Sequence, residues 1–375
     1  MIRTVINSAY RLPYPFLPLF AAGMGVSLNQ MGLAFSIRSV LGVVSPFLAT
    51  LADTHGRKKG MMLGLVLFGA GCLTSSLMPH FLGFILGSSL VVIANGVFIP
   101  SMQSYLSDKI PYEKRGRVLS IAELSWSLGF IIGVPILGYL LKTYHWWSPF
   151  IALSFLAVVL IAVLWFFIPE DKALPQEKNA LTTNLSKVLR YAPVLAGVLT
   201  TFLFTSANEV VNLVFGQWIK DSFGLAFETL AIASIVIGSS EFASEFLSAL
   251  FLDKMGKTRA IFIALFLNIL ALFVLPFGAK FFSIALLALS LFSISFEIAL
   301  IAFMTYMSEL MPSARATVMA ITIATFSLGR MGGSLIGPSL YRSGFWFNCA
   351  TAVLLNLASI LFFRFFQHKS NQKSV

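Results

Sequence analysis

Eight ionisable side chains lie inside the apolar stretches of this sequence, where charges are rare. At the centre of a membrane-spanning helix a charge costs at least about 2.5–3.5 kcal/mol, so such residues usually hold a proton, an ion or a polar solute, or pair with each other. Two of the carboxylates are four residues apart and share a helix face, where they need a cation or a proton. The eight residues are Arg11, Arg38, Glu123, Glu209, Glu241, Glu245, Glu297 and Arg330.

The composition is that of a protein that crosses a lipid bilayer several times. Of the 375 residues, 58% are hydrophobic and 11% are charged, and the mean hydropathy is +0.88, whereas about 25% of the residues of soluble domains are charged. The net charge of +11 is carried by short loops between apolar runs, which favours the lipid bilayer rather than nucleic acid as the partner. The histidines fall in loops or in the tail without ligand spacing, so we expect no metal, no cofactor and no enzyme.

Twelve apolar runs approach the length of about 20 residues that a hydrocarbon core requires. The longest polar interruption, 169–190, divides them six and six, and we predict a cytoplasmic linker there. We therefore predict an all-α membrane protein with six-helix bundles at 1–168 and 191–375, the second followed by a short cytoplasmic tail. The runs are near 4–27, 29–52, 60–79, 81–106, 117–141, 146–168, 191–216, 226–251, 260–278, 281–307, 316–341 and 344–366.

Lysines and arginines concentrate in the loops on one side of this arrangement. If both termini are cytoplasmic, the inner segments hold most of the loop cations and the outer loops hold only four. The positive-inside rule therefore places both termini in the cytoplasm, and we expect a multi-pass protein of the plasma or inner membrane. Tryptophans at the predicted outer helix ends indicate an interfacial aromatic belt: Trp146, Trp147, Trp218 and Trp346.

The sequence repeats at an offset of 200 residues. The stretch from Ala49 to Lys59 returns in weaker form from Ala249 to Arg259, so that Asp53 matches Asp253 and Gly56 matches Gly256. Ser127-Leu128-Gly129 returns as Ser327-Leu328-Gly329, and Tyr105-Leu106-Ser107-Asp108 returns at offset 201 as Tyr306-Met307-Ser308-Glu309. Because each half holds an even number of runs, the halves have the same orientation. Parallel repeats of this kind form the two facing bundles of many transporters.

The repeated stretch resembles a motif of the major facilitator superfamily. That motif reads Gly-x-Leu-Ala-Asp-x-x-Gly-Arg-Lys between the second and third helices, with a degenerate copy in the second half; Ala49 and Ala249 replace its first Gly here. The resemblance covers the whole chain through helix count, repeat and linker. It implies two parallel six-helix bundles that rock about a central solute site, with helices 1, 4, 7 and 10 lining the cavity.

The cavity helices implied by the resemblance carry three charged candidates. Glu297 follows small and apolar residues, which favours its protonated form, so it is the first choice for proton coupling; the alternative is a fixed ion pair with Arg330. Glu209 lies in a polar stretch that suits a solute site or a gate. Arg11 precedes prolines that break the helix, and the alternative for it is an interfacial position. The candidate solute and proton site is Arg11, Tyr14, Asn95, Gln103, Glu209, Asn212, Glu297 and Arg330.

The two motif loops are predicted to act as a gate. The resemblance places Asp53 against the start of the eleventh helix, where exposed N–H groups and the helix dipole favour a carboxylate by about 0.3–2 kcal/mol, and Asp253 against the start of the fifth. Gly56 and Gly256 allow tight turns, and Arg57 pairs with acids or lipid phosphates. We expect these contacts to close the cytoplasmic side in one state and to break in the other. The alternative is that the cations only set the topology.

Four further intramembrane charges lie on helices that the resemblance brings together between the bundles. We predict that they form ion pairs between the halves in one conformational state that break in another. These residues are Arg38, Glu123, Glu241 and Glu245.

Together these patterns predict a monomeric secondary transporter that moves a small solute by alternating access. Proton-coupled efflux of amphipathic or drug-like compounds leads, because the cavity helices carry many aromatic residues, although the fifth-helix pattern of drug–proton antiporters is incomplete at 129–138. The alternative is uptake or facilitated transport of a sugar or organic anion, and the other class is a non-transporting membrane receptor or scaffold. The sequence contains no Gly-x-x-x-x-Gly-Lys motif, which argues against ATP as the energy source.

Overall fold

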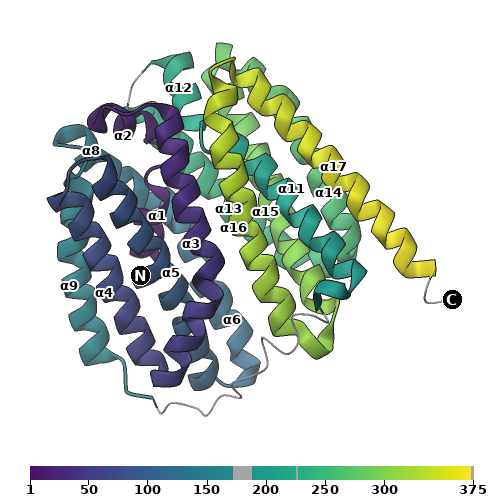
Figure 1. Cartoon of the computed structure of the whole chain (residues 1–375), viewed down its shortest axis with the longest axis horizontal. Helices are drawn as coiled ribbons and strands as arrows, with labels where there is room; N and C mark the ends of the chain where they lie inside the picture. The colour runs from purple at the N-terminus through teal and green to yellow at the C-terminus, as the bar shows by residue number, and fades with distance from the viewer. Residues whose placement is uncertain (172–187, 225–226, 373–375) are drawn as a thin grey trace. The chain divides into compact units, whose positions relative to one another are not determined.

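A computed structural model describes residues 1–171, 188–224 and 227–372, and their side chains apart from those of 45–55, 112–113, 115–117, 120, 316 and 366–372. Every regular element in this part of the chain is a helix (Figure 1). The chain divides into two units, Met1–Gln176 with Leu225–Gly238, and Glu177–Gly224 with Ser239–Val375. The predicted all-α class is therefore confirmed, and the limits predicted for the linker stay a prediction.

Local sequence signals set the helix boundaries of the first unit. Ser27 and Gln30 form a capping box at the start of α3, in which the side chain of each accepts a hydrogen bond from the backbone N–H of the other. Gly56 separates α3 from α4 with a φ of 100°, a conformation that favours glycine. Figure 1 shows α4 beside α9 in this unit. The elements are α1 (Ile2–Arg11), α2 (Leu17–Met24), α3 (Leu28–His55), α4 (Arg57–Leu77), α5 (Phe81–Lys109), α6 (Tyr112–Glu123), α7 (Ser125–Leu128), the π-helix η1 (Gly129–Gly133), α8 (Val134–Thr143) and α9 (Ser148–Phe167).

Two prolines break the first predicted span into α1 and α2. Pro13 and Pro15 have no backbone N–H, so the helical hydrogen-bond ladder stops before them. The N–H of Tyr14 donates to the carbonyl of Arg11 at 3.1 Å rather than to the carbonyl of Tyr10, four residues back. The break therefore frees the Tyr10 carbonyl oxygen to accept a hydrogen bond from a side chain.

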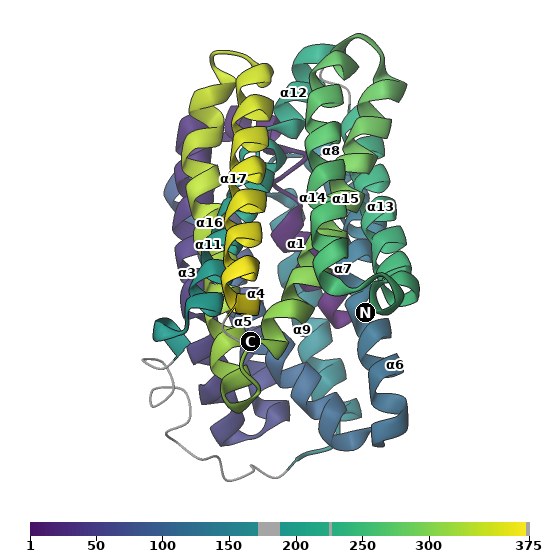
Figure 2. The same ribbon diagram turned by 90° about the vertical axis from the view of Figure 1, so that its right-hand side faces the viewer.

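The second unit repeats the glycine turn between two of its long helices. Gly256 has a φ of 80° and stands between α13 and α14, as Gly56 stands between α3 and α4. Figure 2 shows α14 beside α15 and α17. The elements are α11 (Ala192–Asn212), α12 (Phe215–Phe223), α13 (Phe227–Met255), whose first turns group with the first unit, α14 (Lys257–Val274), the 3-10 helices η2 (Leu275–Lys280) and η3 (Pro312–Ala314), α15 (Phe282–Glu309), α16 (Arg315–Tyr341) and α17 (Phe345–Gln372).

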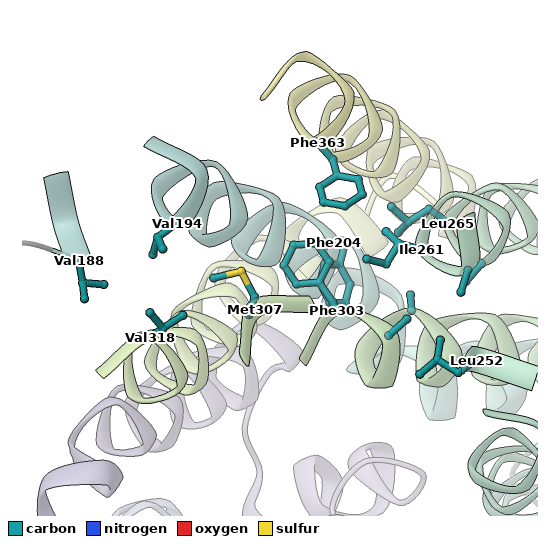
Figure 3. Close-up of a cluster of buried hydrophobic side chains, with 14 of the residues drawn as sticks. Val188, Val194, Phe204, Leu252, Ile261, Leu265, Phe303, Met307, Val318 and Phe363 are labelled. Carbon is teal, nitrogen blue, oxygen red and sulfur yellow. The ribbon is translucent and has the colours of Figure 1, made fainter. Parts of the chain in front are cut away.

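Buried aromatic rings join three helices of the second unit (Figure 3). Phe303 of α15 lies 5.6 Å from Phe204 of α11 and 5.5 Å from Phe363 of α17, measured between ring centroids. Pairs at such separations gain about 0.5–1.5 kcal/mol beyond the burial of their area. This cluster fixes α11, the helix that carries Glu209, against α15, the helix that carries Glu297.

Large apolar side chains cover the outer faces of the helices. On α9, for example, the exposed fraction is 71% for Phe155 and 79% for Phe166. Such exposure of large apolar side chains is unfavourable in water and favourable in a lipid bilayer. Ten helices within the described residues are long and apolar enough to cross a membrane, and 28–44, the part of α3 whose side chains are described, is also apolar. The multi-pass class is confirmed. The count of twelve spans is not confirmed in full, because the first run is divided between two short helices.

The predicted tryptophan belt is wrong for two of its four members. Trp146 is buried against Phe20 and Phe84. Trp218 is only 3% exposed and stacks on Phe345 with ring centroids 4.6 Å apart. Both rings pack on other aromatic rings, and each such pair contributes about 0.5–1.5 kcal/mol beyond the burial of its area.

Candidate functional site

A polar face runs along α1 in the first unit. Arg3, Asn7 and Arg11 follow one another at intervals of four residues, so they lie on the same side of the helix, and all three are buried. Each of them contacts the segment 122–126, where α6 ends and α7 begins. The side chains of α1 thus meet a helix break whose backbone carbonyls are available as acceptors.

Arg3 holds Glu123 in an ion pair. Its Nη2 lies 2.6 Å from Glu123 Oε2, and its Nη1 donates to the carbonyl of Ala122 at 3.0 Å. The amide of Gln103, on α5, donates to the other oxygen of Glu123 at 2.9 Å. These partners of Glu123 belong to its own unit, and its predicted pairing between the bundles stays a prediction. Sequence reasoning missed Arg3, although its spacing from Asn7 and Arg11 was a signal.

Arg11 lies among backbone and aromatic groups of the fifth predicted span. Its Nη1 donates to the carbonyl of Trp126 at 3.0 Å, and its guanidinium carbon lies 4.3 Å from the ring centroid of Trp126 and 3.5 Å from that of Phe130. A desolvated cation–π contact contributes about 2 kcal/mol. The rings therefore stabilise the charge of Arg11 inside the helix bundle.

Arg38, on α3, occupies the position that the proline break opens. Its Nη1 donates to the freed carbonyl of Tyr10 at 3.2 Å. Its guanidinium carbon lies 4.2 Å from the ring centroid of Tyr10, 4.3 Å from that of Phe35 and 5.3 Å from that of Tyr14. Tyr14, a predicted site residue, meets Phe35 edge-on at 4.9 Å. On α5, the other predicted amide, Asn95, has a buried Oδ1 that accepts no hydrogen bond within the described residues.

In the second unit, Glu209 is the centre of a polar contact between α11 and α16. The side chain is 1% exposed and Oε1 accepts a hydrogen bond from the hydroxyl of Ser334 at 3.0 Å. One turn earlier, the hydroxyl of Ser206 donates to the carbonyl of Gly329 at 3.1 Å. Asn212, at the end of α11, is half-buried. The predicted polar stretch of α11 thus faces α16.

Glycines allow these close approaches in both halves. A Cβ at Gly333 would lie 2.6 Å from Glu209 Cβ, a separation that real Cβ atoms do not adopt. In the first unit a Cβ at Gly133 would lie 2.5 Å from Ser8 Cβ. Gly133 and Gly333 are 200 positions apart, so the repeat seen in the sequence is also a repeat of packing.

The remaining predicted charges lie in the second unit. Glu241, on α13, and Glu297, on α15, are buried, and Glu245 and Arg330 are half-buried. The fixed ion pair between Glu297 and Arg330, and the pairing of Glu241 and Glu245 between the bundles, stay predictions.

The motif loop of the first unit contacts the chain just beyond α9. The carboxylate of Asp171 accepts hydrogen bonds from the backbone N–H groups of Arg57, at 2.6 Å, and Lys58, at 3.0 Å, the first residues of α4. The Nε of Arg57 lies 3.4 Å from Oδ2 of Asp108. The side chain of Asp53 lies outside the described residues. Sequence reasoning treated Asp171 only as part of a linker and missed this contact.

The second motif loop repeats one of these contacts. Lys257 pairs with Glu309, and these residues match Arg57 and Asp108 at offsets of 200 and 201. Asp253 is exposed. The gating roles predicted for both loops stay predictions.

Comparisons with known proteins agree with the fold and the repeat. The family model described as Major Facilitator Superfamily matches residues 3–334 and 198–374. The chain is 25% identical over 341 residues to the uncharacterized MFS-type transporter YwfA of Bacillus subtilis (strain 168), across 88% of this chain and 82% of that protein. It is 25% identical over 389 residues to the multidrug resistance protein MdtG of Proteus mirabilis (strain HI4320), across 97% and 94%. A crystal structure of the nucleoside transporter NupG shares the fold, with a TM-score of 0.79 at 15% identity across 96% of this chain and 99% of that one. The chain belongs to the major facilitator superfamily.

Proposed function

We propose that this protein is a secondary active transporter that exports amphipathic or drug-like solutes in exchange for protons, by alternating access. Family membership supports the transport of a small solute. Relatives that are named multidrug resistance proteins match most of the chain, although at low identity. These names support, for this chain, a solute with a large apolar part.

The buried carboxylates of the second unit carry the proposal of proton exchange. Glu209 and Glu297 lie on different helices and are both buried. An acid inside a membrane-spanning helix is costly unless it takes up a proton or binds a cation, and exchange of a solute for a proton requires such a group. Glu209 already accepts a hydrogen bond from Ser334, which fixes its carboxylate and suits a solute contact. Glu297, which follows small and apolar residues in α15, is the first choice for carrying the proton.

A second candidate function is uptake or facilitated transport of an organic anion. The observation in its favour is the charge of the first unit, in which Arg3, Arg11 and Arg38 are all buried. Arg3 pairs with Glu123, whereas Nε and Nη2 of Arg38 have no hydrogen-bond partner within the described residues. A buried guanidinium with unpartnered N–H groups suits a solute that brings a negative group.

Proton flux into proteoliposomes tests the proposal. With the pH-sensitive dye pyranine inside, addition of ethidium or 2-naphthoate should drive a proton flux in the wild type, and addition of D-glucose should not. Glu297→Gln should abolish the flux and retain solute binding. Glu170→Gln, which alters an exposed carboxylate after α9, is the matched control and should behave as the wild type.

Three other outcomes would contradict parts of this proposal. An unchanged flux in Glu297→Gln would remove Glu297 from coupling. Solute movement without proton flux in the wild type would favour facilitated transport. Solute binding without movement of either solute or proton would favour a receptor.

A further inference from the structure

The guanidinium of Arg38 has one edge that donates a hydrogen bond and one edge, here called the open edge, that has no hydrogen-bond partner within the described residues. The side chain is 2% exposed, and Nη1 donates to the Tyr10 carbonyl at 3.2 Å. Its Nε and Nη2 are buried and have no hydrogen-bond partner within the described residues, where no carboxylate pairs with Arg38 either. The two unpartnered N–H groups are adjacent, and they form the two-pronged edge with which arginine binds a carboxylate.

A purely structural role leaves this arrangement unexplained. Each buried N–H group without an acceptor costs about 1–3 kcal/mol, and an apolar side chain of similar volume would avoid that cost. Aromatic rings stabilise the charge of Arg38 by stacking on the faces of its planar guanidinium. They do not accept hydrogen bonds from the N–H groups along the edge of that group. The freed Tyr10 carbonyl and the rings hold the guanidinium in one orientation, so that the open edge is preorganised for an acceptor.

We propose that the Nε and Nη2 edge of Arg38 binds the carboxylate of the transported solute, and that the solute is an amphipathic aromatic carboxylate. The inference rests on the proposed transport of amphipathic solutes and specifies their charge. A carboxylate has two coplanar oxygens that match the two N–H groups. Its single charge makes it less costly to dehydrate at this buried place than a phosphate group with two charges.

The aromatic surroundings specify the rest of the solute. Tyr10, Tyr14 and Phe35 all lie within 5.3 Å of the guanidinium carbon, measured to their ring centroids. Tyr10 is half-buried whereas Tyr14 and Phe35 are buried, so the ring of Tyr10 belongs to the most exposed of the three residues. A flat ring attached to the carboxylate would pack on this ring by offset stacking or edge-to-face contact.

Equilibrium binding of two matched probes to the purified full-length protein in detergent tests the inference. The probes are 2-naphthoate and 2-naphthamide, which share the ring and the planar shape and differ in charge. The wild type should bind 2-naphthoate at least about tenfold more tightly, because two charge-assisted hydrogen bonds form only with the carboxylate. Arg38→Met should bind both probes with equal affinity. Arg342→Met, which removes an exposed arginine, is the matched control and should keep the wild-type preference.

Two results would overturn the inference. They are equal affinity of the wild type for the two probes, and a preference that persists in Arg38→Met. Equal affinity for the two probes is also expected if a carboxylate of the chain itself binds the open edge. If Arg38→Met elutes as an aggregate, Arg38→Lys decides: lysine keeps the charge but lacks the two-pronged edge, and should lower the preference several-fold. Because binding is measured without a gradient, a failure of proton exchange would leave this result unaffected.

Discussion

Gly133 of the first unit and Gly333 of the second, 200 positions apart, make similar close contacts with α1 and α11. Ser8, three residues before Arg11, packs against Gly133, and Ser206, three residues before Glu209, packs against Gly333. The glycines keep the helices close in each half, and in the second half Glu209 itself packs against Gly333. A charged residue therefore lies within one turn of each glycine contact, Arg11 in the first half and Glu209 in the second.

Loss of the hydroxyl that donates to Glu209 should destabilise the second unit. Ser334→Ala leaves a buried carboxylate without that donor, which costs about 1–3 kcal/mol, and the apparent Tm in detergent should fall. Thr322→Val is the control on the same helix, because the Thr322 hydroxyl donates to the backbone carbonyl of Val318 in its own helix. An equal fall of the Tm in both variants would show that the Ser334 hydroxyl does not support Glu209.

A methyl group at the packing glycines should separate the helices that they join. In Gly333→Ala the new Cβ would lie 2.6 Å from Glu209 Cβ, and overpacking of this kind costs about 1–3 kcal/mol. Gly332→Ala is the matched control, because there the nearest atoms, in Phe202 and Ser206, lie at an ordinary 3.5 Å. Thermal unfolding should show a lower Tm for the first variant alone. A similar Tm in both would contradict the close approach of α11 and α16.

The sequence predicted the features that depend on local composition. Apolar runs, loop cations and the 200-residue repeat specify helices, membrane and two halves, because each is a property of a short stretch or of its copy. The conformation of the turn glycines was predictable in the same way: Gly56 and Gly256 lie in the short polar loops that follow apolar runs, and both have positive φ.

The contacts of the site depend on residues far apart in the chain, and the sequence contains no local signal for most of them. Asp171 lies 114 positions from Arg57, and nothing in a polar linker distinguishes it from Glu170. The ring contacts of Arg38 involve Tyr10, at the end of α1, and Tyr14, in the proline break that follows it. Arg3 is different, because its spacing from Arg11 places both residues on one helix face. The positive-inside rule alone, however, also accounts for a cation near a cytoplasmic N-terminus.

Removal of the Asp171 carboxylate should loosen the start of α4. It accepts hydrogen bonds from the backbone N–H groups of Arg57 and Lys58, the role of a helix N-cap, and loss of such a cap costs about 0.5–2 kcal/mol. In Asp171→Ala, amide hydrogen exchange should therefore become faster in the first turn of α4. Glu170→Gln, next to it and exposed, should exchange as the wild type does. Unchanged exchange in Asp171→Ala would show that solvent replaces the cap at no cost.

The ion pair of Arg3 and Glu123 should couple α1 to the end of α6 energetically. A double-mutant cycle with Arg3→Met, Glu123→Gln and the double variant isolates the pair from the other contacts of each residue. Glu123 is partly exposed and also accepts a hydrogen bond from Gln103, so solvent and the amide each compensate part of the loss. We expect a coupling free energy of about 0.5–1 kcal/mol in unfolding experiments, at the upper end of the range for exposed pairs.

High salt should reduce this coupling free energy little, because the Arg3 side chain is buried and is screened less than a surface charge. A coupling near zero would mean that Glu123 exchanges Arg3 for another partner, as pairing between the bundles requires.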